Sequence, residues 1–224
     1  MGVDATPSCD EGFGEKDDGT DSMSPTFAKI FFIVGTLLYI AIRLSFVRQS
    51  RQVRVAKIER EGLEKRLLFI AFLGTIVLPL TYLATGILSF ADYSFSPVNA
   101  WFGLCLWIAS TGVFWKSHKD LGLEWSPVLA MREDHQLITR GVYRRLRHPM
   151  YASIWGFVIA QALLLPNWVA GFSGIVAFAI LYFSRIKAEE QMLQRHFGPA
   201  YDAYRESTGG VVPKWRRRSH TEIH

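Results

Sequence analysis

Apolar residues gather in five long runs along the chain, and polar residues fill the segments between these runs. The runs cover about residues 27–47, 67–90, 98–115, 151–165 and 167–184. The first three are long enough to cross a hydrocarbon core about 30 Å thick, which takes ~20 residues of helix. The last two are shorter and meet at Pro166-Asn167, so we expect a tight helical hairpin whose helices continue past their apolar parts.

Basic residues occur in every second segment between the runs. Residues 48–66 hold seven Lys and Arg, residues 116–150 hold seven, and the chain from residue 185 onward holds eight. Residues 91–97 and the Pro166-Asn167 turn hold none. Because Lys and Arg concentrate on the cytoplasmic side of membrane proteins, this alternation predicts five transmembrane helices, with the N-terminus outside and the C-terminus in the cytoplasm.

Composition agrees with an integral membrane protein. Half of the 224 residues are hydrophobic although 20% are charged, and the net charge is +5. We expect a disordered acidic tail over residues 1–26, a membrane domain over residues 27–215 and a basic tail over residues 216–224. The basic clusters beside the apolar runs argue against nucleic acid as a partner and favour membrane lipids. Only two cysteines occur, too few for a disulfide scaffold.

The segment before the fourth run carries an unusual set of side chains. It extends from His135-Gln136-Leu137-Ile138 through Gly141 and Tyr143 to Arg147-His148-Pro149-Met150-Tyr151. Arginines that fix topology and tyrosines at the membrane interface account for part of it. They leave the two histidines and the glycine unexplained, so a topological role and a functional site both remain open.

A second polar group follows the fifth run. Arg185 and Glu189 are four residues apart and therefore share one face of a helix, where they could form a simple ion pair. Glu190 adds a second acid on the basic side of the membrane, where acids contribute little to topology. Ionisable residues at a membrane boundary are candidates for a functional site when they face the interior of the bundle.

Several motifs that mark other kinds of active site do not occur in the sequence, which limits the reactions to be considered. The chain has no His-Glu-x-x-His zinc motif, so we expect no metal site, and it has no Gly-x-Ser-x-Gly elbow or Gly-rich phosphate loop. Cys9 lies in the acidic tail and Cys105 in the middle of a run, so neither is placed as a nucleophile. The remaining carboxylates, arginine, histidines and aromatic rings suit a cationic or zwitterionic cofactor and an anionic, lipid-like acceptor.

These motifs resemble the isoprenylcysteine carboxyl methyltransferase family. The resemblance rests on Gly141-Val142-Tyr143, Arg147-His148-Pro149-Met150-Tyr151, Glu189-Glu190, Phe197-Gly198 with Tyr201 and Tyr204, and the later Val212-Pro213. It covers about residues 100–215, in which Val142 stands where many members have proline.

The resemblance implies an all-α polytopic methyltransferase. Its cofactor would be S-adenosylmethionine, bound in a cytoplasmic cavity between the loop before the fourth helix and the helix after the fifth. Its acceptor would be a prenylated cysteine or a similar lipid-like molecule with a C-terminal carboxylate. Arg185 would face this carboxylate, and Arg185 and Glu190 are the candidate catalytic residues. The implied cofactor contacts are His135, Gln136, Leu137, Ile138, Tyr143, His148, Pro149, Met150, Tyr151 and Glu189.

Other functions remain open at this stage. Phospholipid amine and small-thiol methyltransferases share this architecture, and their acceptors must lose a proton, for which His148 or Glu190 could serve as the base. A membrane reductase that uses a nicotinamide cofactor and a non-catalytic membrane protein are further alternatives.

Overall fold

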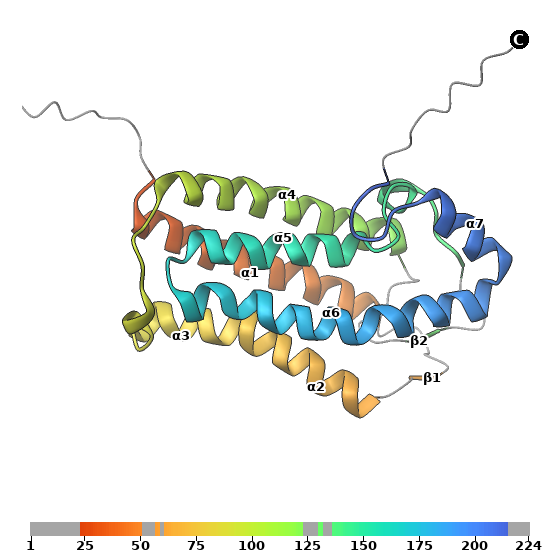
Figure 1. The fold of residues 1–224 in the computed structure, drawn as a ribbon, viewed down its shortest axis with the longest axis horizontal. Helices are drawn as coiled ribbons and strands as arrows, with labels where there is room; N and C mark the ends of the chain where they lie inside the picture. Colours follow the sequence, from red (N-terminus) through yellow and green to blue (C-terminus); the bar gives the residue numbers. More distant parts are fainter. Residues whose placement is uncertain (1–22, 51–56, 59–60, 123–129, 132–135, 215–224) are drawn as a thin grey trace, which may run out of the picture.

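The computed structural model describes residues 23–50, 57–58, 61–122, 130–131 and 136–214, and these form a bundle of helices (Figure 1). The predicted tails fall largely on residues 1–22 and 215–224, which lie outside the described residues. The only strands among the described residues are the two-residue β1 (Lys57–Ile58) and β2 (Ala130–Met131), which pair antiparallel. The helices are α1 (Pro25–Ser50), α2 (Glu61–Phe72), α3 (Leu78–Thr85), α4 (Pro97–Leu121), α5 (Pro149–Leu164), α6 (Trp168–Phe197) and α7 (Pro199–Ser207).

Four helical stretches are long and apolar enough to cross a membrane. They are Pro25–Arg48, Gly62–Thr85, Pro97–Leu121 and Trp168–Phe197. The fourth predicted span corresponds to α5, an apolar helix of only 16 residues. The described structure thus confirms the helical membrane fold, with four spans by length and a shorter fifth apolar helix.

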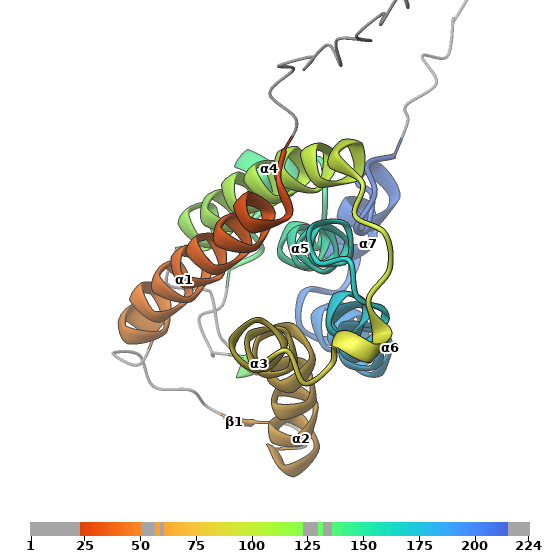
Figure 2. The same ribbon diagram turned by 90° about the vertical axis from the view of Figure 1, so that its left-hand side faces the viewer.

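α5 lies inside the bundle, with α1 and α4 on one side and α6 on another (Figure 2). Gly156 allows α5 to approach α4 closely, because a Cβ at this position would lie 2.0 Å from the hydroxyl oxygen of Ser110. Pro149 occupies the first turn of α5, where a missing N–H group leaves no helical hydrogen bond unmade. The interior position explains how a 16-residue helix is accommodated among longer neighbours.

The second apolar run forms one helical stretch with a widened π-helical turn at Leu73–Val77 between α2 and α3. Within this turn the Gly74 carbonyl accepts hydrogen bonds from the Ser173 hydroxyl (2.6 Å) and the Gln161 side-chain amide (3.2 Å). The stretch ends at Thr85, about five residues before the predicted end. Gly86 has a left-handed φ of 67°, a conformation that glycine adopts without strain at the end of a helix.

The predicted hairpin turn is built around Asn167, which is fully buried. Its side-chain oxygen accepts hydrogen bonds from the backbone N–H groups of Val169 and Ala170, which caps the start of α6. Its amide nitrogen donates to the Leu88 carbonyl and to an Asp92 carboxylate oxygen, each at 2.6 Å. One buried side chain therefore joins the start of α6 to the loop that precedes α4.

α6 continues well beyond the apolar run that predicts it. The run ends near residue 184, whereas the helix continues to Phe197 and ends where Gly198 adopts a φ of 53°. The expectation that the helices of the hairpin continue past their apolar parts is therefore confirmed for α6, which contains the fifth span. The predicted site residues Arg185, Glu189 and Glu190 lie on the same helix as that span.

Candidate active site

A cavity of about 470 Å³ opens among the helices and has two chemically different parts. Its apolar wall includes Phe32 and Ile40 of α1, Leu68 and Phe72 of α2, and further apolar side chains of α4, α5 and α6. Its polar wall consists mainly of Arg43, Gln136, Tyr143, Arg147, His148, Arg185 and Glu189. A molecule that fills the cavity would therefore meet both hydrocarbon and charged groups.

The polar wall begins at a short turn, Gly141–Arg144, that a carboxylate holds against α4. An Asp120 carboxylate oxygen accepts the backbone N–H of Val142 at 2.8 Å. Gly141 has a φ of 61°, and a Cβ at this position would lie 2.0 Å from the same carboxylate oxygen. Both observations require glycine at residue 141, which accounts for the glycine in the sequence motif.

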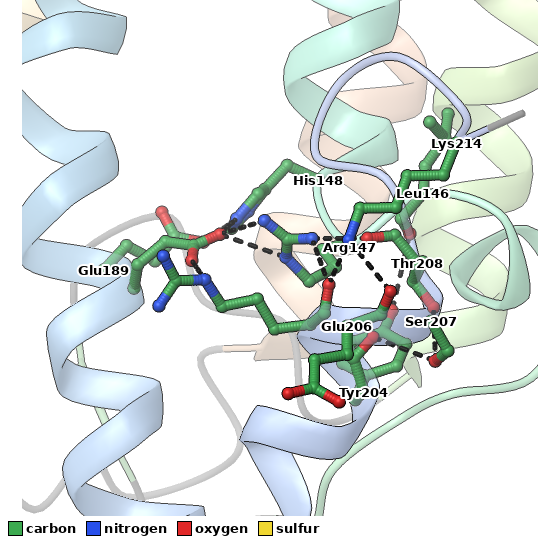
Figure 3. A network of polar contacts seen from close by, with 11 residues as sticks. Leu146, Arg147, His148, Glu189, Tyr204, Glu206, Ser207, Thr208 and Lys214 are labelled. Atoms are coloured by element: carbon green, nitrogen blue, oxygen red, sulfur yellow. Dashed lines mark hydrogen bonds and ion pairs between the residues drawn. The ribbon is translucent and has the colours of Figure 1, made fainter.

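Arg147 and His148, which line the cavity, form one charged cluster with Glu190. Figure 3 shows the polar network around Arg147 and His148. One oxygen of Glu190 accepts hydrogen bonds from the Arg147 Nε (3.1 Å) and Nη2 (3.0 Å), and it lies 2.8 Å from the His148 Nε2. Arg147 Nη1 also donates to the backbone carbonyls of Thr208 and Arg205. Arg147 thereby ties α6 to the chain that follows α7.

The chain after α7 closes this end of the site through backbone contacts, near the network drawn in Figure 3. The N–H groups of Arg147 and His148 donate to the carbonyls of Gly209 (2.7 Å) and Gly210 (3.2 Å). The hydroxyl of Tyr204 donates to the carbonyl of Tyr143 at 2.6 Å. The segments before α5 and after α7 consequently form one folded unit around the cluster.

Glu189 is held by the first turn of α5. The hydroxyl of Tyr151 donates to one Glu189 oxygen at 2.5 Å, and the other oxygen lies 3.5 Å from the His148 Nδ1. The rings of His148 and Tyr151 stack with their centroids 5.8 Å apart. These contacts fix the direction in which the carboxylate faces the cavity.

His148 carries a positive charge at neutral pH in this environment. Burial alone would lower the pKa of its imidazole, but the hydrogen bonds and charges of Glu189 and Glu190 outweigh it and raise this pKa to about 9. A protonated imidazole donates from both nitrogens and has no lone pair with which to accept a proton. His148 is therefore suited to hold the two carboxylates in place and unsuited to act as a base.

Arg185 is buried, and its partner is an acid from a different helix. Its Nη2 lies 3.2 Å from a carboxylate oxygen of Glu64 in α2, whereas the sequence suggested Glu189 as the simple ion-pair partner. Both side chains are at least nine-tenths buried. The Nε of Arg185 has no hydrogen-bond partner among the described residues, and Arg185 lines the cavity. One donor of the guanidinium therefore remains available there.

The structure brings most of the predicted site residues to this one cavity. Those that line it are Gln136, Leu137, Ile138, Tyr143, His148, Pro149, Met150, Tyr151, Arg185 and Glu189. His135 lies outside the described residues. Glu190 is not among the lining residues, and its hydrogen bonds to Arg147 and His148 place it behind them.

Sequence reasoning missed several residues that build the site. It assigned Arg147 to topology. The position of Arg147 directly before His148 was a signal that the two residues could share an acidic partner. Sequence reasoning passed over Glu64, an acid four residues into a helix whose remainder is mostly apolar, and Arg43, an arginine at the end of the first run. It also gave no role to Asp120, for which no local pattern indicated a contact 22 residues away.

The fold and the site together define a helical membrane protein with a charged site at one end of a largely apolar cavity. Residues 103–195 match the model of the isoprenylcysteine carboxyl methyltransferase (ICMT) family. The family resemblance predicted from the sequence is thereby confirmed for this segment. It contains α5, most of α4 and α6, and the loop that carries the Gly141 turn and His148.

Named relatives agree with this match. The protein-S-isoprenylcysteine O-methyltransferase of Schizosaccharomyces pombe is 30% identical over 94 residues, which are 41% of this chain and 40% of that protein. Protein-S-isoprenylcysteine O-methyltransferase A of Arabidopsis thaliana is 38% identical over 85 residues, 36% of this chain and 41% of that protein. The chain thus spans about two fifths of the length of these curated relatives.

A solved structure of a eukaryotic intramembrane Ras methyltransferase of the ICMT type is also similar. It is 21% identical to this chain, with a TM-score of 0.45, and the match covers 70% of this chain and 54% of that one.

Proposed function

We propose that this protein is an S-adenosylmethionine-dependent methyltransferase. Its acceptor would be the C-terminal carboxylate of a prenylated cysteine, or a similar lipid-like molecule that ends in a carboxylate. The observation that carries the proposal is the single cavity that joins charged residues to an apolar wall within the bundle. The family match over residues 103–195 supports the reaction class.

The polar wall suits the methyl donor. S-adenosylmethionine supplies an electrophilic methyl group on a positively charged sulfur, together with an amino acid group and an adenine. Gln136, Leu137 and Ile138 lie outside any helix or strand, so their backbone groups can bind polar parts of a ligand. Glu189 can neutralise a positive charge, and the ring of Tyr151 can contact an aromatic ligand.

The charge states in the site favour a carboxylate over an amine or a thiol as acceptor. His148 is protonated at neutral pH, and Glu190 is already bonded to Arg147 and His148. The two residues that could have accepted a proton are thus committed to each other. A C-terminal carboxylate has a pKa of about 3.3–3.7 and is ionised at pH 7, so its methylation needs no base.

Catalysis then consists mainly of orientation. When bound, the methyl donor would supply its methyl group to a carboxylate oxygen of the acceptor and keep the electron pair of the broken carbon–sulfur bond. The rate depends on holding the reacting atoms in line and about 3–3.5 Å apart. Arg185 can direct the acceptor carboxylate through its Nε donor, because Glu64 occupies its Nη2.

We further propose that the membrane arrangement has five crossings, with α5 as the fourth. The N-terminus would lie outside, and the active site and C-terminus would lie in the cytoplasm. The basic segments before α2 and before α5, and the basic residues from Arg185 onward, would then all face the cytoplasm. The acceptor's hydrocarbon tail would enter from the bilayer toward the apolar wall of the cavity.

Cofactor binding is the first test. Purified protein in detergent should bind S-adenosylmethionine and S-adenosylhomocysteine in calorimetry, and Glu189→Ala and His148→Ala should weaken both. Glu206→Ala is the matched control, because Glu206 is exposed on α7 and does not line the cavity. If the folded wild type produces no binding heat with either ligand, the proposal is wrong.

A second test concerns Arg185. Replacing it with lysine keeps the charge that pairs with Glu64 but removes the Nε donor. Methyl transfer to a farnesylcysteine acceptor should fall about tenfold, as expected for the loss of a charge-assisted hydrogen bond, while cofactor affinity changes little. A rate equal to that of the wild type would assign Arg185 to structure alone.

A further inference from the structure

The positively charged residues that line the cavity differ in whether they have an acidic partner. Arg147 and His148 are bonded to Glu190, and Arg185 is paired with Glu64. Arg43 also lines the cavity, but it forms no ion pair or hydrogen bond with any residue that the structure describes. A half-buried guanidinium in a largely apolar cavity is costly unless an anion binds it.

Contacts on both sides of Arg43 fix its helix in place. Tyr39, one turn earlier in α1, packs against Phe114 of α4 with ring centroids 4.5 Å apart. Phe46, one turn later, packs against His118 of α4 at 4.8 Å. Residues four apart lie on one helical face, so Arg43 follows Tyr39 along the wall of the cavity that α1 forms.

The charged side chains around the cavity indicate which charge a ligand could supply. Among the described cations that line the cavity, Arg147, His148 and Arg185 pair with the carboxylates of Glu64, Glu189 or Glu190, whereas Arg43 pairs with none of them. Arg185 can donate a hydrogen bond to a ligand, but Glu64 already balances its charge. A ligand carboxylate therefore finds its unmatched positive charge at Arg43.

We propose that Arg43 binds the carboxylate of the acceptor and selects acceptors that carry this negative charge. The inference rests on the proposed function and adds a residue of α1, which lies outside the segment that matches the family model. The methyl donor also has a carboxylate. The acceptor is favoured because Arg43 continues the row of α1 residues Phe32, Thr36, Tyr39 and Ile40 along the cavity, where a hydrocarbon tail would pack.

The test compares two ligands that differ only in charge. One is N-acetyl-S-farnesylcysteine, which has a free carboxylate, and the other is the corresponding carboxamide, which is neutral. Binding of each to the folded protein in detergent is measured without the methyl donor. The wild type should prefer the carboxylate by about tenfold or more, as expected for a charge-assisted hydrogen bond. Arg43→Gln should lose this preference, and Arg43→Lys should keep part of it.

Arg48→Gln is the matched control, because it removes the same charge from the exposed end of the same helix. It should leave the preference for the carboxylate unchanged. A preference that survives in Arg43→Gln, or one that Arg48→Gln abolishes equally, would overturn the proposal. So would weaker S-adenosylhomocysteine binding in Arg43→Gln with unchanged acceptor binding, since the carboxylate at Arg43 would then be the donor's.

This readout is separate from the test of the proposed function. If the wild type binds the carboxylate selectively through Arg43 but transfers no methyl group, the anion site stands and the proposed reaction fails. If the wild type transfers methyl groups and binds both ligands equally, the reaction stands and the role of Arg43 fails.

Discussion

His148 connects three parts of the site. Its ring nitrogens lie near Glu189 and Glu190 of α6, its backbone N–H donates to Gly210, and its ring stacks on Tyr151. A neutral imidazole has one donor nitrogen, so it could serve only one of the two carboxylates as a donor. A protonated His148 therefore suits this position better than a neutral one.

This charge predicts a pH dependence of stability. The folded-state pKa of His148, about 9, lies above its ordinary value of 6.5, so its contribution is complete below about pH 6.5 and is lost as pH rises through 9. A shift of this size corresponds to roughly 3 kcal/mol. The melting temperature of the wild type in detergent should therefore fall between pH 7 and pH 10 more steeply than that of His148→Gln. Parallel curves for the two proteins would contradict the assignment.

At the residue scale, the sequence predicted the members of the site better than their partners. His148, Tyr151 and Glu189 were recognisable as site candidates, because polar residues clustered at a membrane boundary suggest a functional site. The contacts between these residues could not be predicted, because a single sequence does not show how close α5 lies to α6. Arg185 shows this most clearly, since its actual partner Glu64 lies 121 positions away in the chain.

At the element scale, the π-helical turn at Leu73–Val77 joins the α2–α3 stretch to its neighbours. The turn directs the Gly74 carbonyl toward Ser173 and Gln161, so a polar contact forms between helices at an otherwise apolar depth. Hydrogen bonds between membrane helices contribute about 0.6 kcal/mol each on average, and close packing of small residues adds to them.

Gly74 should therefore tolerate no side chain. A Cβ at this position would lie 2.5 Å from the Cβ of Ala177 and 2.6 Å from the backbone oxygen of Ser173. Gly74→Ala should lower the melting temperature in detergent, because α2 and α3 must move away from α6. Gly62→Ala is the control, since nothing lies within 4 Å of a Cβ there. Equal melting temperatures for the two variants would show that the packing at Gly74 is not tight.

The apolar runs of the chain predicted which membrane helices exist but misplaced some of their ends. The second stretch ends at Thr85, directly before Gly86 in its left-handed conformation, although apolar residues continue to Phe90. α6 continues to Phe197, beyond its apolar part that ends near residue 184, as expected for a helix of the predicted hairpin. Hydrophobicity reports what surrounds a helix, whereas the backbone at residues such as Gly86 and Gly198 determines where it ends.

At the scale of the whole molecule, the number of crossings is a prediction that reporter fusions can check. A reporter fused after residue 224 should be cytoplasmic, and one fused before Ser24 should be external, because five crossings place the termini on opposite sides. A third reporter inserted between residues 91 and 97 should be external. Termini on the same side would show that α5 does not cross the bilayer.

The length of α6 has a consequence for the membrane in which the protein works. Its 30 residues make a continuous rod of ~45 Å, against a hydrocarbon core of about 30 Å. Asn167 anchors one end of the rod, and Glu189 lies near the other. Bilayer thickness would therefore set how deeply the charged site sits below the lipid headgroups. In vesicles of defined phospholipids, methyl transfer should peak at one acyl-chain length and decline in thinner and thicker bilayers.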